Sequence, residues 1–418
     1  MSADPAILLD VSRLISRLGK GPATGIDRVE AEWLAHLGQS AQPCLLLARV
    51  RRGQLLLPCE AGRKILDWLS GRVEDLPDPV LIDRLRGRQD LSARAEAALR
   101  RMALHAAGPV GRGIAARAAA LLGGDAIYLN VGHSNLSAPL LAGLGALRRV
   151  VLVHDTIPLD HPEFTRAGQS AKFRERLAAV LGHADQILAI SGATRDAILG
   201  WRDRMGIPAG ADVFVAPIGT RLAVPAPLSA QIAPDRPYFV TLGTIEPRKN
   251  HALLLDCWET MAGRLPAEAM PGLVIIGRRG WENHVTFARL DRCPANGVVR
   301  EFSNLDDGAV AGLLDGCHAL LMPSRAEGFG LPYTEAAARG IPVLSAPLPV
   351  ARELLGDYAR YLSPDDTGQW ADAVIEIAAR PVLRHPALAV PQWDAHFAAV
   401  EGLMREGLHP RSAAAMPG

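Results

Sequence analysis

With 418 residues, of which 49% are hydrophobic, the chain exceeds one ordinary hydrophobic core and predicts two domains. Its formal net charge of +1 and its 5% aromatic content exclude a nucleic-acid binder that relies on a strong positive field or on stacking side chains. The five cysteines are scattered and never form a Cys-x-x-Cys pair, so we expect them to be reduced and structural.

The amino-terminal residues, Met-Ser-Ala-Asp-Pro, lack the basic-then-apolar layout of a secretory signal. The best membrane-like stretch, residues 139–153, is interrupted by Arg148 and Arg149 and is too short to span a bilayer. We therefore expect a cytoplasmic protein.

Short apolar runs of β type alternate with helical patterns along the whole chain, which is typical of parallel, doubly wound α/β sheets. In the first half, strands are predicted at residues 7–10, 44–50, 127–131, 150–154, 187–191 and 213–217. In the second half they are predicted at residues 238–242, 273–277, 298–302, 319–323 and 342–345. Between the halves, prolines interrupt residues 223–237, which lack periodicity and predict an interdomain linker.

Two places in the first half carry candidate functional residues. A glycine turn near the amino end opens a predicted helix, which Thr24 or Gly25 can cap, and its free amides can approach a phosphate or an acceptor sugar. The apolar run at 150–154 delivers His154 and Asp155 to the carboxyl end of a predicted strand. A histidine beside a strand end is more often structural than catalytic, so its role depends on the rest of the chain.

In the second half, two cationic residues follow the predicted strand 238–242. Arg248 and Lys249 lie near its carboxyl end, which is the edge where open α/β sheets bind ligands. Either residue alone could be a solvated charge at a helix start. Together with two downstream glutamates they predict a phosphate clamp.

These glutamates, Glu327 and Glu335, are eight positions apart in the segment 325–340. Pro332 suits the first turn of a helix, so backbone amides near residues 329–331 would form an anion site. Glu335 can accept hydrogen bonds from a vicinal diol such as a ribose, and Glu327 can hold other hydroxyl groups. A nucleotide that carries a sugar requires all these features.

The sequence Gly-Thr-x-Glu-Pro-Arg-Lys-Asn from residue 243, followed by Pro-Ser-x-x-Glu-Gly-Phe-Gly-Leu-Pro-x-x-Glu from residue 323, resembles family 4 of the retaining glycosyltransferases, which have the GT-B fold. The resemblance covers nearly all of residues 238–365. It implies a nucleotide-diphosphate-sugar donor, with Arg248 and Lys249 on the diphosphate, Glu335 on the ribose and Glu327 on the donor sugar. The other candidate donor-binding residues are Gly243, Thr244, Gly277, Gly328, Phe329, Gly330 and Leu331.

The first half adds weaker resemblances to the same family. His154 and Asp155 resemble a His-Asp motif that faces the interdomain cleft, which makes His154 a candidate contact to the sugar or the attacking hydroxyl and Asp155 an orienting group. The stretch from Thr24 to Arg28 resembles a Thr-Gly-Ile-x-Arg segment of members that build bacterial surface polysaccharides. Arg28 is then a candidate contact to a donor or acceptor phosphate.

The resemblance also implies a domain organisation. We expect a Rossmann-like acceptor-side domain at 1–222, the linker at 223–237 and a Rossmann-like donor-binding domain at 238–385. A carboxy-terminal helix at 391–405 is expected to pack back on the first domain, and residues 406–418 are expected to be disordered.

The expected reaction is transfer of a sugar, with GDP-mannose as the favoured donor, to a saccharide or lipid-linked saccharide acceptor. Glu327 is either a nucleophile, on the pattern of retaining glycosidases, or a sugar-binding group in a front-face reaction. No metal ligand set and no cofactor is expected, because Arg248, Lys249 and helix amides would stabilise the leaving diphosphate. The alternatives are an epimerase or phosphorylase of the same fold, and a non-catalytic sugar-nucleotide-binding subunit of a polysaccharide assembly complex.

Residues 84–117 are rich in arginine, with alanine and leucine between the arginines. They could form amphipathic helices that contact an anionic inner membrane near a lipid-linked acceptor, or an ordinary solvated face.

Overall fold

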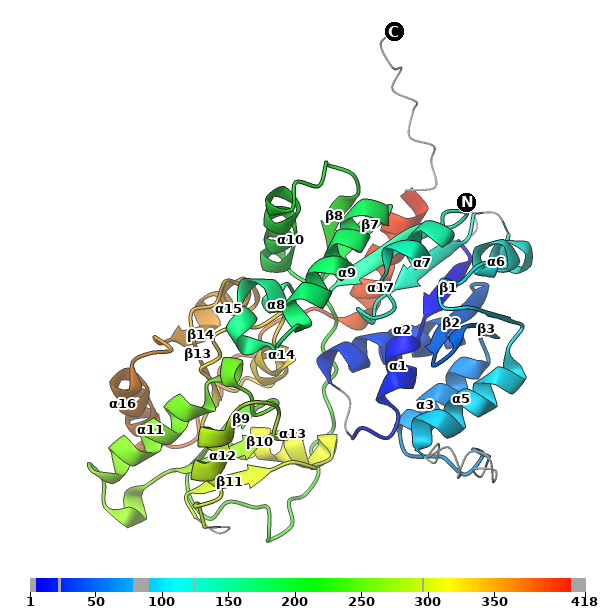
Figure 1. Ribbon diagram of the computed structural model, residues 1–418. Coiled ribbons are helices and arrows are strands. Elements are labelled where there is room, and N and C mark those ends of the chain that lie inside the picture. Colours follow the sequence, from blue (N-terminus) through cyan, green and yellow to red (C-terminus); the bar gives the residue numbers. More distant parts are fainter. Residues whose placement is uncertain (1–4, 22–23, 78–89, 124, 295–296, 407–418) are drawn as a thin grey trace.

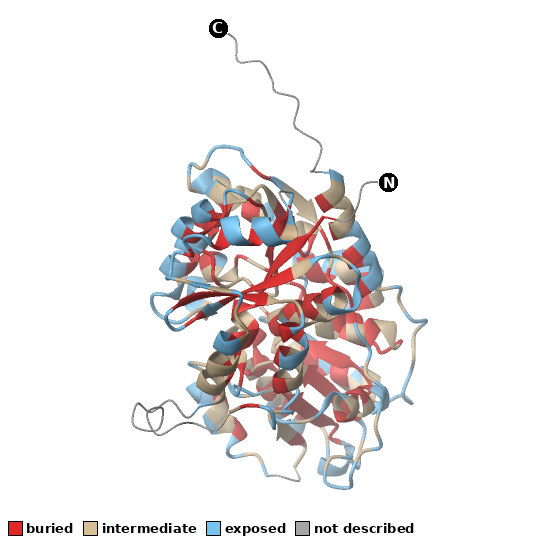
Figure 2. Cartoon of the chain, turned by 90° about the vertical axis from the view of Figure 1, so that its right-hand side faces the viewer, coloured by how far each residue is buried: buried red, intermediate tan, exposed pale blue. Residues whose placement is uncertain are grey.

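The computed structural model describes residues 5–21, 24–77, 90–123, 125–294 and 297–406, and it forms two lobes, each built around one sheet (Figure 1). The candidate residues of the sequence analysis all fall within these ranges, apart from part of the arginine-rich segment and the tail beyond residue 406. Buried residues follow the strands of both sheets (Figure 2). Each lobe therefore has its own hydrophobic core.

The first sheet has eight strands in the order β4-β3-β2-β1-β5-β6-β7-β8. Its strands are β1 (Ile7–Asp10), β2 (Cys44–Val50), β3 (Gly53–Pro58), β4 (His105–Ala107), β5 (Ile127–Asn130), β6 (Arg148–Val153), β7 (Gln186–Ala189) and β8 (Asp212–Val215). Its helices are α1 (Ser12–Arg17), α2 (Gly25–Gln39), α3 (Ala61–Leu69), α5 (Leu91–Met102), α6 (Ile114–Leu122), α7 (Ala138–Gly143), α8 (Ile157–Asp160), α9 (Gln169–His183) and α10 (Gly192–Arg204).

The second sheet has six parallel strands in the order β11-β10-β9-β12-β13-β14. Its strands are β9 (Tyr238–Leu242), β10 (Gly272–Ile276), β11 (Val299–Phe302), β12 (Leu320–Met322), β13 (Val343–Ser345) and β14 (Ala359–Tyr361). Its helices are α11 (His251–Ala262), α12 (His284–Leu290), α13 (Asp307–Gly316), α14 (Leu331–Ala338), α15 (Pro349–Leu355) and α16 (Thr367–Ala378).

The strand order of each sheet reverses once. In the first sheet the reversal lies between β1 and β5, and in the second between β9 and β12. At such a switch point the loops that leave the two neighbouring strands diverge to opposite faces and open a crevice at the carboxyl edge. The fold therefore offers one crevice in each lobe.

The predicted α/β class is confirmed, and the predicted strands are found with shifts of one or two residues at their ends. The sheets are parallel as predicted except at one edge, where β3 and β4 pair antiparallel beyond β2. Gly53 makes this return possible, since it has a φ of 130° and a Cβ there would lie 1.9 Å from the carbonyl oxygen of Ala107. Neither β4 nor the missed edge strand β14 has more than three residues, so pairing rather than local sequence creates them.

The carboxy-terminal helix α17 (Trp393–Glu406) packs against the first lobe. Trp393, Phe397, Val400 and Met404 join the buried cluster that contains Trp33 of α2, whose indole Nε1 donates to His396 Nε2 at 3.1 Å. The Phe397 and Trp33 rings meet edge to face at 4.9 Å between centroids. Strand β1 and helix α17 thus contribute to the same core.

We predict that Phe397→Ala lowers the free energy of unfolding of the first lobe by about 3–5 kcal/mol, because it removes a large side chain from a packed core. Urea unfolding followed by tryptophan fluorescence measures the change. Ala398→Ser, at an exposed position one residue away, is the control and should shift stability by no more than about 0.5 kcal/mol. Equal midpoints for the Phe397→Ala variant and the native chain would mean that α17 contributes nothing to the core.

Candidate active site

A buried ion cluster occupies the switch point of the second sheet. Lys249 Nζ donates to Glu327 Oε1 at 2.5 Å, and Arg248 Nη1 donates to Glu327 Oε2 at 2.9 Å. Ser324 Oγ also donates to Glu327 Oε1, at 2.7 Å, and Glu246 pairs with Arg248 Nε at 2.6 Å. The loops after β9 and β12 are therefore joined through one carboxylate, whose side chain is only 5% exposed.

The electrostatics of this cluster favour its charged form. Burial alone would raise the pKa of Glu327, but Lys249 and Arg248 outweigh it and lower that pKa to about 2. Burial acts against the charge of Arg248 too, yet Glu327 and Glu246 raise its pKa above the usual value. Burial lowers the pKa of Lys249, and Glu327 offsets only part of that effect. Glu327 is thus an ionised carboxylate that accepts hydrogen bonds at both of its oxygens.

Helix α14 begins directly beside this cluster. Gly330 adopts a φ of 92°, which lets the chain turn from the loop into the helix, and Pro332 lies in its first turn. Glu335 lies on the same helix, with its side chain 17% exposed and its Oε1 3.4 Å from Arg28 Nη1 of the first lobe. Burial raises the pKa of Glu335, and Arg28 opposes the change.

The amino end of α2 faces the amino end of α14. A Cβ on Gly25 would lie 3.9 Å from Leu331 Cδ1, and Arg28 reaches both Glu335 and Asp307 of the second lobe. Thr24 caps α2 through a capping box with Asp27. Thr24, Gly25 and Arg28 therefore lie on the first-lobe wall opposite the start of α14.

His154 and Asp155 stand on the same wall, where β6 ends. His154 Nε2 donates to the carbonyl oxygen of Val131 at 2.7 Å, and burial lowers the His154 pKa to about 4, so the ring is neutral with its lone pair on Nδ1. Asp155 Oδ1 accepts from the amide of Ile157 at 3.1 Å, the first residue of α8. Burial raises the pKa of Asp155, against the attraction of Arg248.

The two walls approach each other closely at Gly328. A Cβ at this position would lie 2.9 Å from the carbonyl oxygen of His154 and 3.1 Å from Asp155 Cβ. The neighbouring Phe329 side chain is buried in the first-lobe cluster rather than in the second lobe. The structure thus brings His154, Asp155, Arg248, Lys249, Glu327 and Glu335 around one cleft between the lobes.

Three candidate donor-binding residues lie beside the ion cluster, in the loops after β9 and β10. Gly243 has a φ of 133°, and a Cβ there would lie 3.0 Å from Lys249 Cε. A Cβ on Gly277 would lie 1.9 Å from the carbonyl oxygen of Gly243, so packing of the two loops by itself requires glycine at 277. Thr244 follows Gly243 and is partly exposed.

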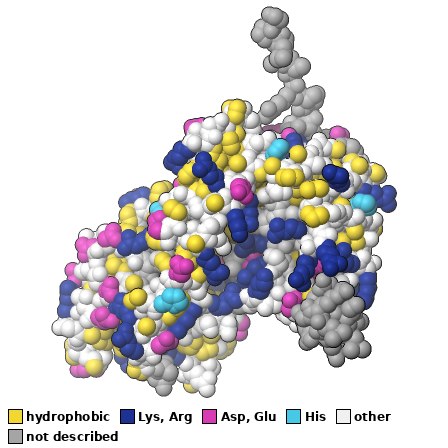
Figure 3. All heavy atoms as spheres, viewed as in Figure 1, with side chains coloured by type: hydrophobic (Ala, Val, Ile, Leu, Met, Phe, Trp, Pro, Cys, Tyr) yellow, Lys and Arg dark blue, Asp and Glu magenta, His cyan; other side chains and the backbone are white. Residues whose placement is uncertain are grey.

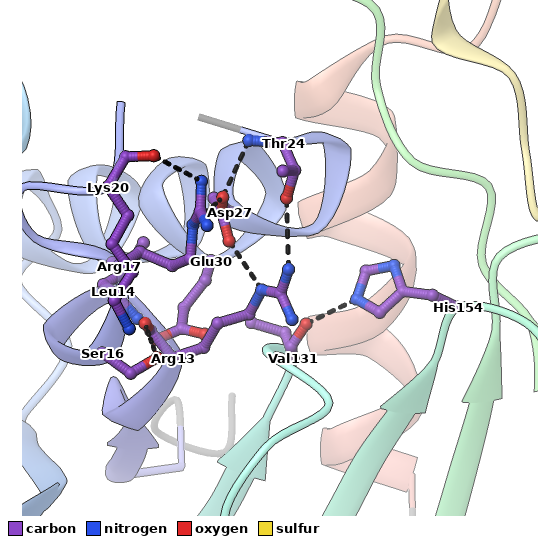
Figure 4. A network of polar contacts seen from close by, with 10 residues as sticks. All are labelled: Arg13, Leu14, Ser16, Arg17, Lys20, Thr24, Asp27, Glu30, Val131 and His154. Atoms are coloured by element: carbon purple, nitrogen blue, oxygen red, sulfur yellow. Dashed lines mark hydrogen bonds and ion pairs between the residues drawn. The ribbon is translucent and has the colours of Figure 1, made fainter. Parts of the chain in front are cut away.

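The sequence analysis missed a second polar network, which lies at the switch point of the first sheet (Figure 4). Arg13 Nε donates to Asp27 Oδ1 at 2.6 Å, and Arg13 Nη2 donates to Thr24 Oγ1 at 3.1 Å. Glu30 Oε1 accepts from the amide of Leu14 at 3.2 Å. The signal available in the sequence was Arg13 directly after a strand, the same signal that identified Arg248.

The described part of the chain contains no group of three or more His, Cys, Asp or Glu side chains placed to hold a metal ion. In the same residues, no helix has both the length and the apolar character needed to cross a membrane.

We predict that Glu327→Gln destabilises the second lobe by about 3–5 kcal/mol at neutral pH, because it leaves two buried cations without their carboxylate. The folded-state pKa of Glu327, about 2, lies below its usual 4.5, so its contribution is complete above pH 4.5 and is lost as pH falls from 4.5 to about 2. The stability gap between the native chain and Glu327→Gln should therefore narrow over that interval in urea titrations at a series of pH values.

Glu175→Gln, at an exposed position of α9, is the matched control and should leave both stability and its pH dependence unchanged. A gap between native chain and Glu327→Gln that stays constant down to pH 2 would contradict the ion cluster.

Comparison with known proteins is consistent with the geometry. Residues 228–386 match the model of the family described as Glycosyl transferases group 1. The serotype-specific mannosyltransferase WbdA of Escherichia coli is 30% identical over 242 residues, which is 54% of this chain and 29% of that protein. The O-antigen chain mannosyltransferase B of Escherichia coli is 33% identical over 131 residues, 31% of this chain and 33% of that protein. The chain thus spans about a third of the length of these relatives.

Two solved structures share the fold along nearly the whole chain. Sucrose-phosphate synthase from Thermosynechococcus elongatus superimposes with a TM-score of 0.60 at 14% identity, over 97% of this chain and all of that one. The Anabaena protein HepE, solved in complex with UDP-glucose, gives a TM-score of 0.59 at 13% identity, over 96% of this chain and 99% of that one. Residues 228–386 are therefore a group 1 glycosyltransferase domain, and the chain has the two-lobed GT-B fold.

Proposed function

We propose that the chain is a retaining, metal-independent glycosyltransferase that moves a sugar from a nucleotide-diphosphate sugar to a saccharide or lipid-linked saccharide during surface-polysaccharide synthesis. The observation that carries this proposal is the placement of Arg248, Lys249 and Glu327 at the second switch point, opposite His154. GDP-mannose is the favoured donor, because several relatives are named mannosyltransferases.

The cations serve the leaving group in this proposal. Negative charge grows on the diphosphate as the bond to the sugar breaks, and preorganised donors in a site shielded from water stabilise that charge best. Arg248 and Lys249 lie next to the amino end of α14, so side-chain charge and helix amides act on the same oxygens.

Glu327 acts as a sugar-binding and positioning group rather than as a nucleophile. Both of its oxygens already accept hydrogen bonds, from Lys249 and Ser324 on one side and from Arg248 on the other. A nucleophilic attack would remove its charge, leaving Lys249 without a carboxylate and Arg248 with Glu246 alone. A front-face reaction, in which the leaving phosphate oxygen accepts the proton of the acceptor hydroxyl, avoids that cost. His154, with Nδ1 free of the bond to Val131, accepts a hydroxyl of the transferred sugar or of the acceptor.

A transfer assay tests the proposal. The native chain should release GDP from GDP-mannose in the presence of a mannan-type oligosaccharide acceptor, should form a glycosylated product with retained configuration, and should do so in EDTA. Lys249→Ala should lower turnover by roughly 10²–10³-fold, the usual loss for one preorganised donor. Lys172→Ala, at an exposed position of α9, is the control.

The alternatives give other outcomes in the same assay. GDP release without acceptor, or conversion of the sugar nucleotide without transfer, would identify an epimerase or a phosphorylase. Tight binding of GDP-mannose with no turnover under any condition would identify a non-catalytic subunit. Loss of activity in EDTA, restored by manganese, would overturn the metal-independent reaction.

We predict that Glu335→Ala weakens GDP binding about tenfold or more, because a carboxylate that accepts hydrogen bonds from the ribose is lost. Isothermal titration calorimetry with GDP measures the effect. The exposed Glu268→Ala is the control. If Glu335→Ala binds GDP as the native chain does, the ribose lies elsewhere.

The proposed partners include the inner membrane, through an exposed face between α5 and α6. Leu104, Val110 and Leu121 are each at least 40% exposed there, alongside the exposed Arg101 and Arg117. Apolar side chains within a basic surface fit an anionic bilayer. The native chain should cosediment with phosphatidylglycerol vesicles, and Arg101→Glu/Arg117→Glu should not. Equal cosedimentation of the native chain and the variant would contradict this contact.

A further inference from the structure

The first sheet has a switch point of its own, at which the topology predicts a ligand-binding crevice that the donor site does not use. It lies where the strand order reverses between β1 and β5. Arg13 is in α1, directly after β1, and His133 follows β5 with a φ of 57°, which is uncommon for a residue with a side chain. Arg49 lies near the end of β2, the neighbour of β1, and its amide donates to Ser12 Oγ at 2.8 Å.

Helix α9 brings a third arginine to this crevice. Its Phe173 packs edge to face on the His133 ring, with 5.2 Å between centroids, and Arg176 lies one turn further along the same helix. Partial desolvation and the like charges of Arg49 and Arg13 lower the pKa of Arg176. The contact of Arg49 with Ser12, the neighbour of Arg13, and the contact of α9 with His133 thus bring the three arginines to one edge of the first sheet.

Few negative charges balance this cluster. The structure records ion pairs of Arg13 and Arg17 with Asp27, but none of Arg49 or Arg176 with any described residue. Both of these side chains are exposed. In Figure 3, Lys and Arg side chains gather along the crease between the two lobes. Unbalanced, mutually repelling cations at a switch point indicate a site for an anion.

Two carboxyl groups of the first lobe, Asp10 and Glu30, are buried and bonded within the lobe rather than to these arginines. Burial raises the pKa of Asp10, and burial together with Asp10 raises the pKa of Glu30 well above its usual value. Glu30 is wholly buried and its Oε2 has no hydrogen-bond partner in the described residues. A Cβ on Gly132 would lie 1.6 Å from that oxygen, so the 132 backbone packs directly on the Glu30 carboxyl group. Glu30 thus bonds to α1 through the Leu14 amide and contacts the loop at 132.

We propose that Arg13, Arg49, Arg176 and His133 bind a phosphate group carried by the acceptor. Guanidinium groups bind phosphate through paired hydrogen bonds, and three of them offer more donors than a carboxylate can accept. This site rests on the proposed function, which assigns the donor diphosphate to the opposite wall. The rings of His133 and His154 are 5.8 Å apart, so a phosphate held here places its attached sugar beside the reaction centre.

Calorimetric titration with inorganic phosphate tests the site. The titration is made with GDP at saturation, so that the donor diphosphate site is filled. The native chain should bind phosphate, and Arg49→Gln/Arg176→Gln should weaken binding at least tenfold, because hydrogen bonds to a charged ligand are lost. Arg174→Gln is the matched control, since Arg174 is exposed on α9 but two residues away, on the far side of the helix.

The outcomes separate this site from the proposed function. If GDP binds and phosphate affinity is the same in the native chain and in Arg49→Gln/Arg176→Gln, the phosphate site is overturned while the donor site stands. If GDP itself fails to bind, GDP-mannose is removed as the donor, and direct titration with phosphate still measures the arginine cluster.

The source of the phosphate is resolved by two further probes. If the site recognises the phosphate group alone, glycerol 3-phosphate and a short-chain phosphatidic acid should both bind Arg49→Gln/Arg176→Gln more weakly than they bind the native chain. A loss confined to phosphatidic acid would identify a lipid-linked acceptor and would support the same site. In transfer reactions, a phosphorylated acceptor should show a raised KM in this variant with GDP affinity unchanged, and equal KM values would contradict the proposal.

Discussion

The geometry of the cleft depends on the carboxylate of Glu327. It joins the loops after β9 and β12, which neighbour each other in the sheet although some eighty residues separate them in sequence. Removing one partner from a buried charge cluster is costly, because the remaining charges lose their solvation without gaining a counter-charge. Arg248 and Lys249 can therefore stay charged and in place before any donor binds.

The ion cluster around Glu327 is close to electrically neutral, which limits the attraction that it can offer to an anion. Arg248 and Lys249 are matched by Glu246 and Glu327, so the pairs alone provide orientation more than net positive potential. In the proposed function, the additional attraction for a diphosphate comes from the amides of α14 and from cations of the first lobe. That proposal therefore needs both lobes to complete one anion site.

Contacts between the lobes connect closure to the same loops. Gly328 lies against the backbone of His154, and Arg28 pairs with Glu335 and Asp307. Glu353 of α15 accepts hydrogen bonds from the amides of Gly192 and Ala193, at the amino end of α10. A carboxylate of one lobe therefore caps a helix of the other. Relative movement of the lobes must break these bonds. A few charged groups therefore contribute to the free energy that holds the lobes in this arrangement.

The sequence predicted the site best where an apolar strand pattern ends close to charged residues. Arg248, Lys249, Glu327 and Glu335 could be placed because strand ends of a parallel sheet meet at one edge, and apolar runs mark those ends. The strand β4 could not be predicted, since His105, Ala106 and Ala107 have no strand preference and pair only because β3 offers an edge. The partners of Glu327 within its cluster depend on rotamers and burial, which no local pattern encodes.

The first-lobe arginines escaped prediction for a related reason. Arg13, Arg49 and Arg176 come from three separate elements, and each alone resembles a solvated surface charge. They indicate a site only because the fold brings them together. The place where they meet is determined by the reversal of strand order between β1 and β5. Asp10 and Glu30 are buried and accept hydrogen bonds from the amides of Ser12 and Leu14, so neither forms an ion pair with these arginines. A fold does not gain stability from like charges held together, so this arrangement is best explained by a ligand that brings the opposite charge.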